Sequence, residues 1–138
     1  MPTLPWVTPN KPEPETEALV MASRLQVKSL TDVPGFLFRS VFAWRQVRKA
    51  PGAYGASLIA DLFHGVFWTL SAWESREALY RFSGSEPHRG IVKKLKPSMR
   101  VSYFTFWTVD TSQLPIKWKD AKQRLAQEQK ENPAGLHS

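Results

Sequence analysis

Apolar and polar residues alternate between about residues 18 and 27, with the period of a β-strand that turns one face to a core. Leu19 and Leu25 fall on one side of this strand, and Arg24 falls on the other. The alternation predicts a half-buried strand as the first element of the folded part of the chain.

A helical spacing follows the strand. Thr31 or Asp32 can cap the helix, Pro34 suits its first turn, and Pro51 lies beyond its end. The apolar residues that recur at helical spacing are Leu37, Val41 and Trp44. We therefore predict one amphipathic helix over about residues 32–49.

Two strands are predicted next, at about 54–62 and 65–73, and they form a hairpin. Ser75 caps a helix that Gly84 interrupts, and a second helical segment follows the interruption. The last strand, at about 100–109, is rich in aromatic and β-branched residues. The order β-α-β-β-α-β is that of a ferredoxin-like α+β fold, an antiparallel sheet with helices on one face.

The third and fourth strands of this pattern carry large apolar side chains on both faces, as Phe67 and Trp68 illustrate. Helices can cover only one face of the sheet, so the other face must meet a second layer. The simplest cover is the sheet of a second copy, because a large apolar patch is seldom left exposed. The pattern therefore predicts a homodimer.

The segments outside this domain, which spans residues 18–113, differ from it in composition. Residues 1–17 are rich in proline and predict an extended tail that Trp6 can anchor. Residues 114–138 predict an extra C-terminal helix at 116–131 with a frayed end. We expect this helix to pack outside the barrel or across the dimer.

Composition narrows the classes of function. The chain of 138 residues has no cysteine, which excludes disulfides, thiolate zinc sites and iron–sulfur clusters and agrees with a cytoplasmic location. No apolar run is long enough for a membrane span or a secretory signal. The net charge is +7, and one segment holds a concentration of basic residues, which indicates either a solvated helix face or a patch that attracts an anionic partner. No nucleic-acid-binding motif accompanies this charge. The concentration comprises Arg89, Lys93, Lys94, Lys96 and Arg100.

The run Phe67–Ser75, followed by Ala78–Leu79, Phe82 and His88, resembles the family of dimeric α/β-barrel proteins related to antibiotic-biosynthesis monooxygenases. It is also similar to uncharacterised bacterial proteins of this fold and to spheroidene-type monooxygenases. The resemblance implies a homodimer with a pocket between each subunit's sheet and helices. Some relatives oxidise aromatic compounds with molecular oxygen and no cofactor, and others bind haem.

His88 is the first candidate for a catalytic residue, because it follows Pro87 at the predicted start of a helix. A neutral imidazole there can accept a proton from a phenol-like substrate, or it can ligate haem iron. In the haem alternative, Arg89, Arg81 or Lys93 would meet the propionates. A structural role, with the ring bonded to a backbone carbonyl, is the competing interpretation.

Several aromatic side chains are candidates for the substrate-binding wall, although core packing is the better explanation for each of them. They are Trp68, Trp73, Tyr54, Phe82, Tyr103 and Trp107. Trp68 and Trp73 lie on opposite faces of a regular strand, so at most one of them can line a given pocket. The other histidines, His64 and His137, are expected to be exposed and inert, and scattered histidines do not predict a metal site.

Three functions remain open from the sequence. The first is a monooxygenase-like oxidoreductase, without a cofactor, that acts on an apolar or aromatic small molecule. The second fills the same pocket with haem. The third is a dimeric binding module without catalysis, which the scarcity of convergent polar groups favours.

Overall fold

The computed structural model describes residues 3–85 and 88–135, which form a five-stranded antiparallel sheet in the order β1-β3-β4-β2-β5. The strands are β1 (Thr3–Val7), β2 (Glu17–Val27), β3 (Ala53–Asp61), β4 (Val66–Trp73) and β5 (Met99–Asp110). The helices of this part of the chain are α1 (Val33–Val47), α2 (Arg76–Ser83), α3 (His88–Leu95) and α4 (Trp118–Glu131). The four strands that follow β1 confirm the predicted ferredoxin-like order.

The ends of the helices follow the predicted signals closely. The Ser75 hydroxyl accepts a hydrogen bond from the Ala78 N–H at 3.1 Å, and Gly84 terminates α2. Asp32 takes the position before α1, but its side chain makes no capping bond there. Ser75 and Gly84 thus set the two ends of α2, the helix that directly follows β4.

The N-terminal segment differs from the predicted extended tail, because residues 3–7 form the edge strand β1, which pairs with β3. Proline is tolerated on an edge strand, which explains how Pro5 fits there. Trp6 anchors the segment, as predicted, by lying directly over Gly55. A Cβ atom at Gly55 would come within 1.8 Å of the Trp6 ring, so only glycine allows this contact.

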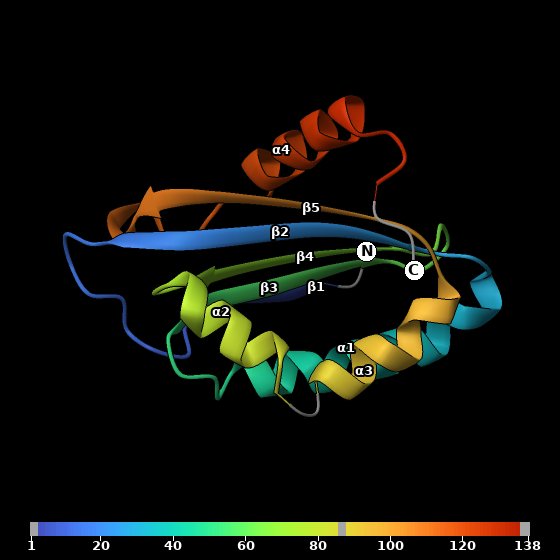
Figure 1. The fold of residues 1–138 in the computed structure, drawn as a ribbon, viewed down its shortest axis with the longest axis horizontal. Coiled ribbons are helices and arrows are strands. Elements are labelled where there is room, and N and C mark those ends of the chain that lie inside the picture. Colours follow the sequence, from blue (N-terminus) through green and yellow to red (C-terminus); the bar gives the residue numbers. More distant parts are fainter. Residues whose placement is uncertain (1–2, 86–87, 136–138) are drawn as a thin grey trace.

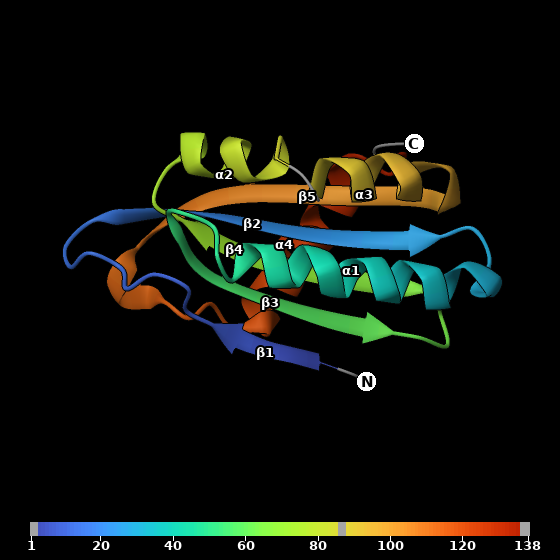
Figure 2. The same ribbon diagram turned by 90° about the horizontal axis from the view of Figure 1, so that it is seen from below.

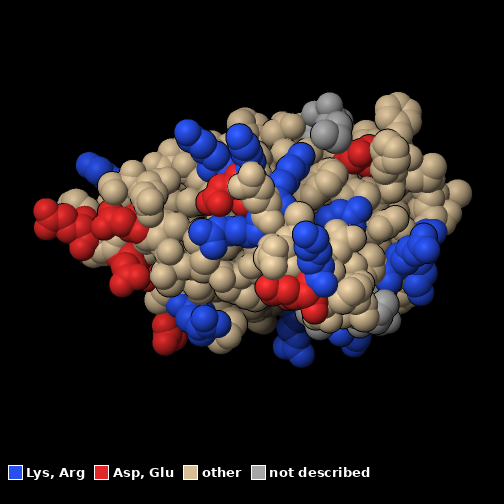
Figure 3. All heavy atoms as spheres, turned by 90° about the horizontal axis from the view of Figure 1, so that it is seen from above, with Lys and Arg blue, Asp and Glu red and all other residues tan. Residues whose placement is uncertain are grey.

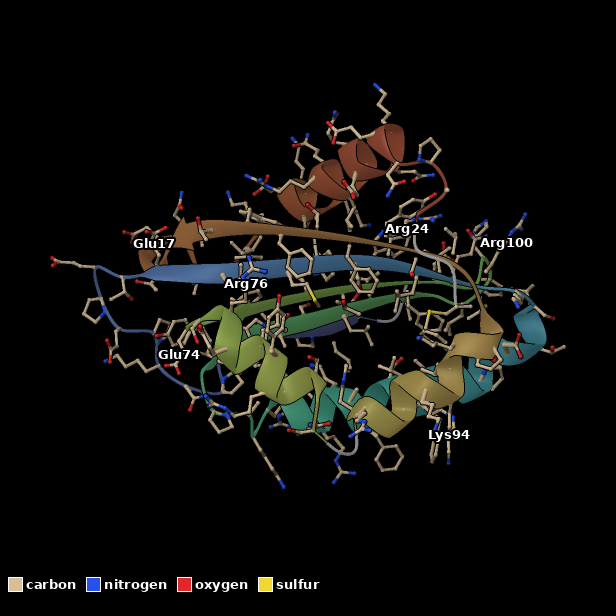
Figure 4. All side chains as sticks on the ribbon, viewed as in Figure 1. Glu17, Arg24, Glu74, Arg76, Lys94 and Arg100 are labelled. Atoms are coloured by element: carbon tan, nitrogen blue, oxygen red, sulfur yellow. The ribbon has the colours of Figure 1, made fainter. Side chains whose placement is uncertain are left out.

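The sheet has helices on both faces. Figures 1 and 2 show α1, α2 and α3 on one face and α4 alone on the other. Side chains alternate between the faces: Leu19 packs toward α1 and α2, whereas Val20 packs toward α4. Arg24 lies on the α4 side, opposite Leu19, as the alternation predicted (Figure 4).

The helix α4 is attached to the sheet along its whole length. Near its start, the Trp118 indole N–H donates to the Ser57 hydroxyl at 3.1 Å. Beyond its end, the Tyr103 hydroxyl donates to the Pro133 carbonyl at 2.7 Å. Between these bonds Leu125 is only 2% exposed. The chain up to residue 135 is therefore held on the sheet rather than frayed, while His137 lies outside the described residues.

The second face of the sheet is thus covered differently from the simplest expectation, in which the sheet of a second copy packs on it. The chain's own α4 supplies that layer and adds two cation–π contacts. The Lys122 ammonium lies 4.5 Å from the Trp68 ring centre, and the Arg124 guanidinium lies 4.4 Å from that of Trp107. Basic and acidic side chains are interspersed over this face (Figure 3). The homodimer stays a prediction, but an uncovered sheet face is no longer the reason for it.

Candidate functional site

A groove of about 700 Å³ lies between the C-terminal halves of α1 and α2. One wall of the groove comes from one side of α1, where Phe42 and Arg45 are one helical turn apart, and continues to Lys49 in the turn after the helix. Its wall on α2 includes Arg81 and Phe82. The remaining lining residues are Gln46, Ala50, Pro51, Ala78 and Ser85. None of the described lining residues belongs to a strand. The groove therefore lies between two helices on the helical side of the sheet, and not between the sheet and the helices as the resemblance implied.

His88 adjoins this groove without being one of the described residues that line it. Its backbone N–H donates to Gln46 Oε1 at 2.7 Å, and its ring packs against Phe82 with the ring centres 4.7 Å apart. Both contacts are made to residues of the groove wall. His88 therefore lies immediately behind that wall, at the start of α3.

The protonation state of His88 follows from its surroundings. Its Nδ1 lies 3.2 Å from the Ser83 carbonyl oxygen. A carbonyl can only accept a hydrogen bond, so Nδ1 carries the proton and Nε2 keeps its lone pair. Burial lowers the pKa of His88 below its ordinary value of 6.5, although the Ser83 carbonyl acts in the opposite direction. The ring is thus neutral at pH 7, with Nε2 as a proton acceptor.

Phe82 connects His88 to the core of the sheet. Its ring centre lies 5.1 Å from that of Trp73, which does not belong to the described lining of the groove. Trp73 is 1% exposed, and its indole N–H donates to the Ser71 hydroxyl at 2.9 Å. Of this pair, only Phe82 lines the groove, and Trp73 supports it from behind.

The other aromatic candidates lie on the opposite face of the sheet. Tyr54, Trp68, Tyr103 and Trp107 pack under α4 in a cluster with Leu125. The predicted set of wall residues is therefore divided by the sheet into two groups, and no single site unites them. The predicted opposition of Trp68 and Trp73 explains this division, because it follows from the strand period alone.

The remaining candidate groups do not join the groove. The His64 side chain is 76% exposed and pairs with Asp61 at 2.9 Å. This bond supplies a partner that the sequence did not reveal, and it lowers the pKa of Asp61. Arg89 is exposed on α3, and Lys94 extends away from the sheet (Figure 4). Within the described ranges, no cluster of acidic and histidine side chains is arranged to hold a metal ion.

Sequence reasoning missed the wall that α1 contributes. It named Leu37, Val41 and Trp44 on this helix and selected none of the residues that form the wall. The sequence feature that could have indicated this wall is the helical spacing of Phe42, Arg45 and Lys49, which form an exposed stripe of one aromatic and two cationic residues. Such a stripe cannot be linked to Phe82 until the packing of α1 beside α2 is known.

The residues present do not fit haem. An axial histidine has to open onto a slot wide enough for the porphyrin. His88 is instead covered by Phe82 and lies outside the described lining of the groove. A proton acceptor has a weaker requirement, because it can reach a substrate through one bridging water.

Comparison with solved structures confirms the fold class, which is that of the antibiotic-biosynthesis-monooxygenase-like proteins. SnoaB, a cofactor-independent oxygenase from Streptomyces nogalater, superposes with a TM-score of 0.57 and 13% identity over 71% of this chain and 97% of its own. An antibiotic biosynthesis monooxygenase superposes with a TM-score of 0.58 and 19% identity, over 67% of this chain and 97% of its own. A protein from Pseudomonas aeruginosa superposes with a TM-score of 0.61 and 12% identity, over 67% of this chain and 94% of its own.

The family model described as a domain of unknown function, DUF3291, matches residues 6–135. The chain belongs to this family. No curated protein matches the sequence. Within the described residues, none of the helices is both long enough and apolar enough to cross a membrane.

Proposed function

We propose that the chain is a monooxygenase-like oxidoreductase that acts on an aromatic or other apolar small molecule in the groove between α1 and α2. His88 is the proton acceptor, and no bound cofactor takes part. The observation that carries the proposal is the neutral His88 ring behind the groove wall, whose Nδ1 is bound to the Ser83 carbonyl so that Nε2 is the nitrogen that can accept a proton. The fold shared with a cofactor-independent oxygenase supports the class of reaction.

The chemistry that fits these residues begins at an activated C–H group of the substrate. His88 Nε2 takes the proton through one bridging water and leaves a delocalised carbanion. The carbanion gives its electron pair to molecular oxygen, which forms a C–O bond and, after protonation, a hydroperoxide. Loss of the second C–H proton and cleavage of the O–O bond give a carbonyl group and water. One CH₂ group and one O₂ are consumed, so no external reductant is needed.

The aromatic residues under α4 have no part in this reaction, because the sheet separates them from His88. Phe82 and Phe42 are the aromatic walls, and Trp73 fixes the position of Phe82. A substrate between such walls loses part of its water, which strengthens the pull of Nε2 on the proton.

The test is oxygen uptake with anthrone, a tricyclic aromatic ketone whose CH₂ group is acidic. We expect the wild-type protein to raise uptake above the spontaneous rate and to yield anthraquinone. The His88→Gln variant should lose about a hundredfold, the usual contribution of a general base. The His64→Gln variant, which changes an exposed histidine of the β3–β4 turn, should retain full activity. Equal rates for wild type and His88→Gln contradict the proposal.

A second candidate is a binding module without turnover, and the composition of the groove favours it. No carboxylate, thiol or imidazole is present among its described lining residues. A ligand that binds in the groove while oxygen uptake stays at the spontaneous rate would establish this function instead. A homodimer and a cytoplasmic location stay predictions under either function.

A further inference from the structure

The polar side chains of the groove are nearly all hydrogen-bond donors. Arg45, Lys49 and Arg81 are cations and can only donate. Gln46 behaves in the same way, because its Oε1 already accepts the His88 N–H at 2.7 Å, which leaves the NH₂ end for a ligand. The Ser85 hydroxyl donates to the Arg81 carbonyl, so the acceptors left among the described polar side chains are its lone pairs and the second lone pair of Gln46 Oε1.

None of the three cations forms an ion pair within the described part of the protein. The ion pairs within residues 3–85 and 88–135 are His64–Asp61 and Arg124–Asp120, neither of which includes a groove residue. The C-terminal ends of α1 and α2 also point here, and each carries about half a negative charge. Three positive side chains, set against these two helix ends and the Glu74 carboxylate beside Gly52 and Ala78, leave the groove with a positive balance of charge.

The apolar part of the lining is aromatic and lies beside the cations. Phe42, on α1, precedes Arg45 by one helical turn, and Phe82 follows Arg81 directly. A ligand that satisfies both parts has a flat apolar body and an anionic group at one end. The anionic group accepts from the guanidinium and ammonium groups, which bind carboxylate and phosphate oxygens strongly.

We propose that the groove selects aromatic ligands that carry an anionic group, a carboxylate or a phosphate, and that Arg45, Lys49 and Arg81 bind this group. The proposal rests on the groove assigned in the proposed function, and it names the class of substrate. His88 is then placed at the apolar body of the ligand, beside Phe82, rather than at its charged end.

The first test compares two fluorescent probes that differ in charge. Anilinonaphthalene sulfonate carries an anion, and N-phenyl-naphthylamine has the same aromatic body without it. We expect the sulfonate to bind more tightly by about tenfold or more, the effect of one charge-assisted hydrogen bond. Equal affinity for the two probes overturns the proposal.

Variants of the cations locate the site. Arg81→Gln and Lys49→Gln should each weaken sulfonate binding by about tenfold and leave the neutral probe unchanged. Lys94→Gln removes the same charge from the outer side of α3 (Figure 4) and is the matched control. If Lys94→Gln weakens binding as much as Arg81→Gln, the effect is one of net charge and the groove is not the site.

Competition identifies the anionic group. Naphthoate or naphthyl phosphate should displace the sulfonate probe from the wild-type protein, whereas neutral naphthalene methanol should not. Displacement by neither anion overturns the proposal. Because these measurements need no turnover, they separate the two ideas. Probe binding that depends on Arg81, together with no oxygen uptake from either anthrone or an anthrone that carries a carboxylate, refutes the oxidation and retains the anionic ligand.

Discussion

The packing of α4 on the sheet can be tested by the substitution Leu125→Ala. Leu125 is 2% exposed and contacts a cluster of buried residues that includes Val20 and Leu70. Truncation of a buried leucine removes its transfer free energy and leaves a cavity, which together cost about 2–5 kcal/mol. A domain of this size has a free energy of unfolding of about 5–15 kcal/mol. The substitution should therefore remove a large part of the stability.

The assay is urea unfolding followed by tryptophan fluorescence, with Gln129→Ala as the control. Gln129 is exposed on the same helix, and glutamine and alanine differ little in helix propensity, so its substitution should change the unfolding free energy by less than about 0.5 kcal/mol. A loss below about 1 kcal/mol for Leu125→Ala would mean that α4 is not packed in solution as described.

Three further perturbations follow from contacts already described. Gly55→Ala should destabilise the protein by about 1–3 kcal/mol, because the new Cβ meets the Trp6 ring. The loss should vanish in a Trp6→Ala background, and additive losses in a double-mutant cycle would contradict this explanation. Ser57→Ala removes the hydroxyl that donates to the Leu4 carbonyl and accepts from the Trp118 indole N–H. Amide hydrogen exchange should therefore become faster in both β1 and α4. Faster exchange in only one of these elements would contradict the role of this hydroxyl in holding both. Burial lowers the pKa of His88, so the unfolded chain takes up a proton first as the pH falls below about 6.5. The unfolding free energy should therefore decrease on acidification from pH 7 and level off below the folded pKa, and this decrease should be smaller in His88→Gln, as measured by urea unfolding at several pH values.

The arrangement of the strands was largely predictable because each strand has a clear local signal. The alternation around Leu19 and Arg24 predicted the two faces of β2, and Ser75 with Gly84 predicted both ends of α2. The edge strand β1 was missed because its proline content argues against a strand, and an edge position removes that objection only when the neighbouring strand is known.

The candidate site was predictable only in part, because its halves come from distant segments. His88 and Phe82 belong to a short local motif, so they could be selected from the sequence. The wall of Phe42 and Arg45 becomes part of the site only through the packing of α1 beside α2. The aromatic residues under α4 were assigned to a pocket because a sequence shows which face a residue takes but not which layer covers that face.

The position of α4 has a consequence for how the protein responds to dilution. A sheet face covered by a second copy becomes exposed when the protein concentration falls below the dissociation constant. Here the covering layer is joined to β5 through residues 111–117, so its effective concentration is about millimolar whatever the amount of protein. The sheet should therefore stay covered at nanomolar concentration, and any association of two chains can be weak and reversible without uncovering the core.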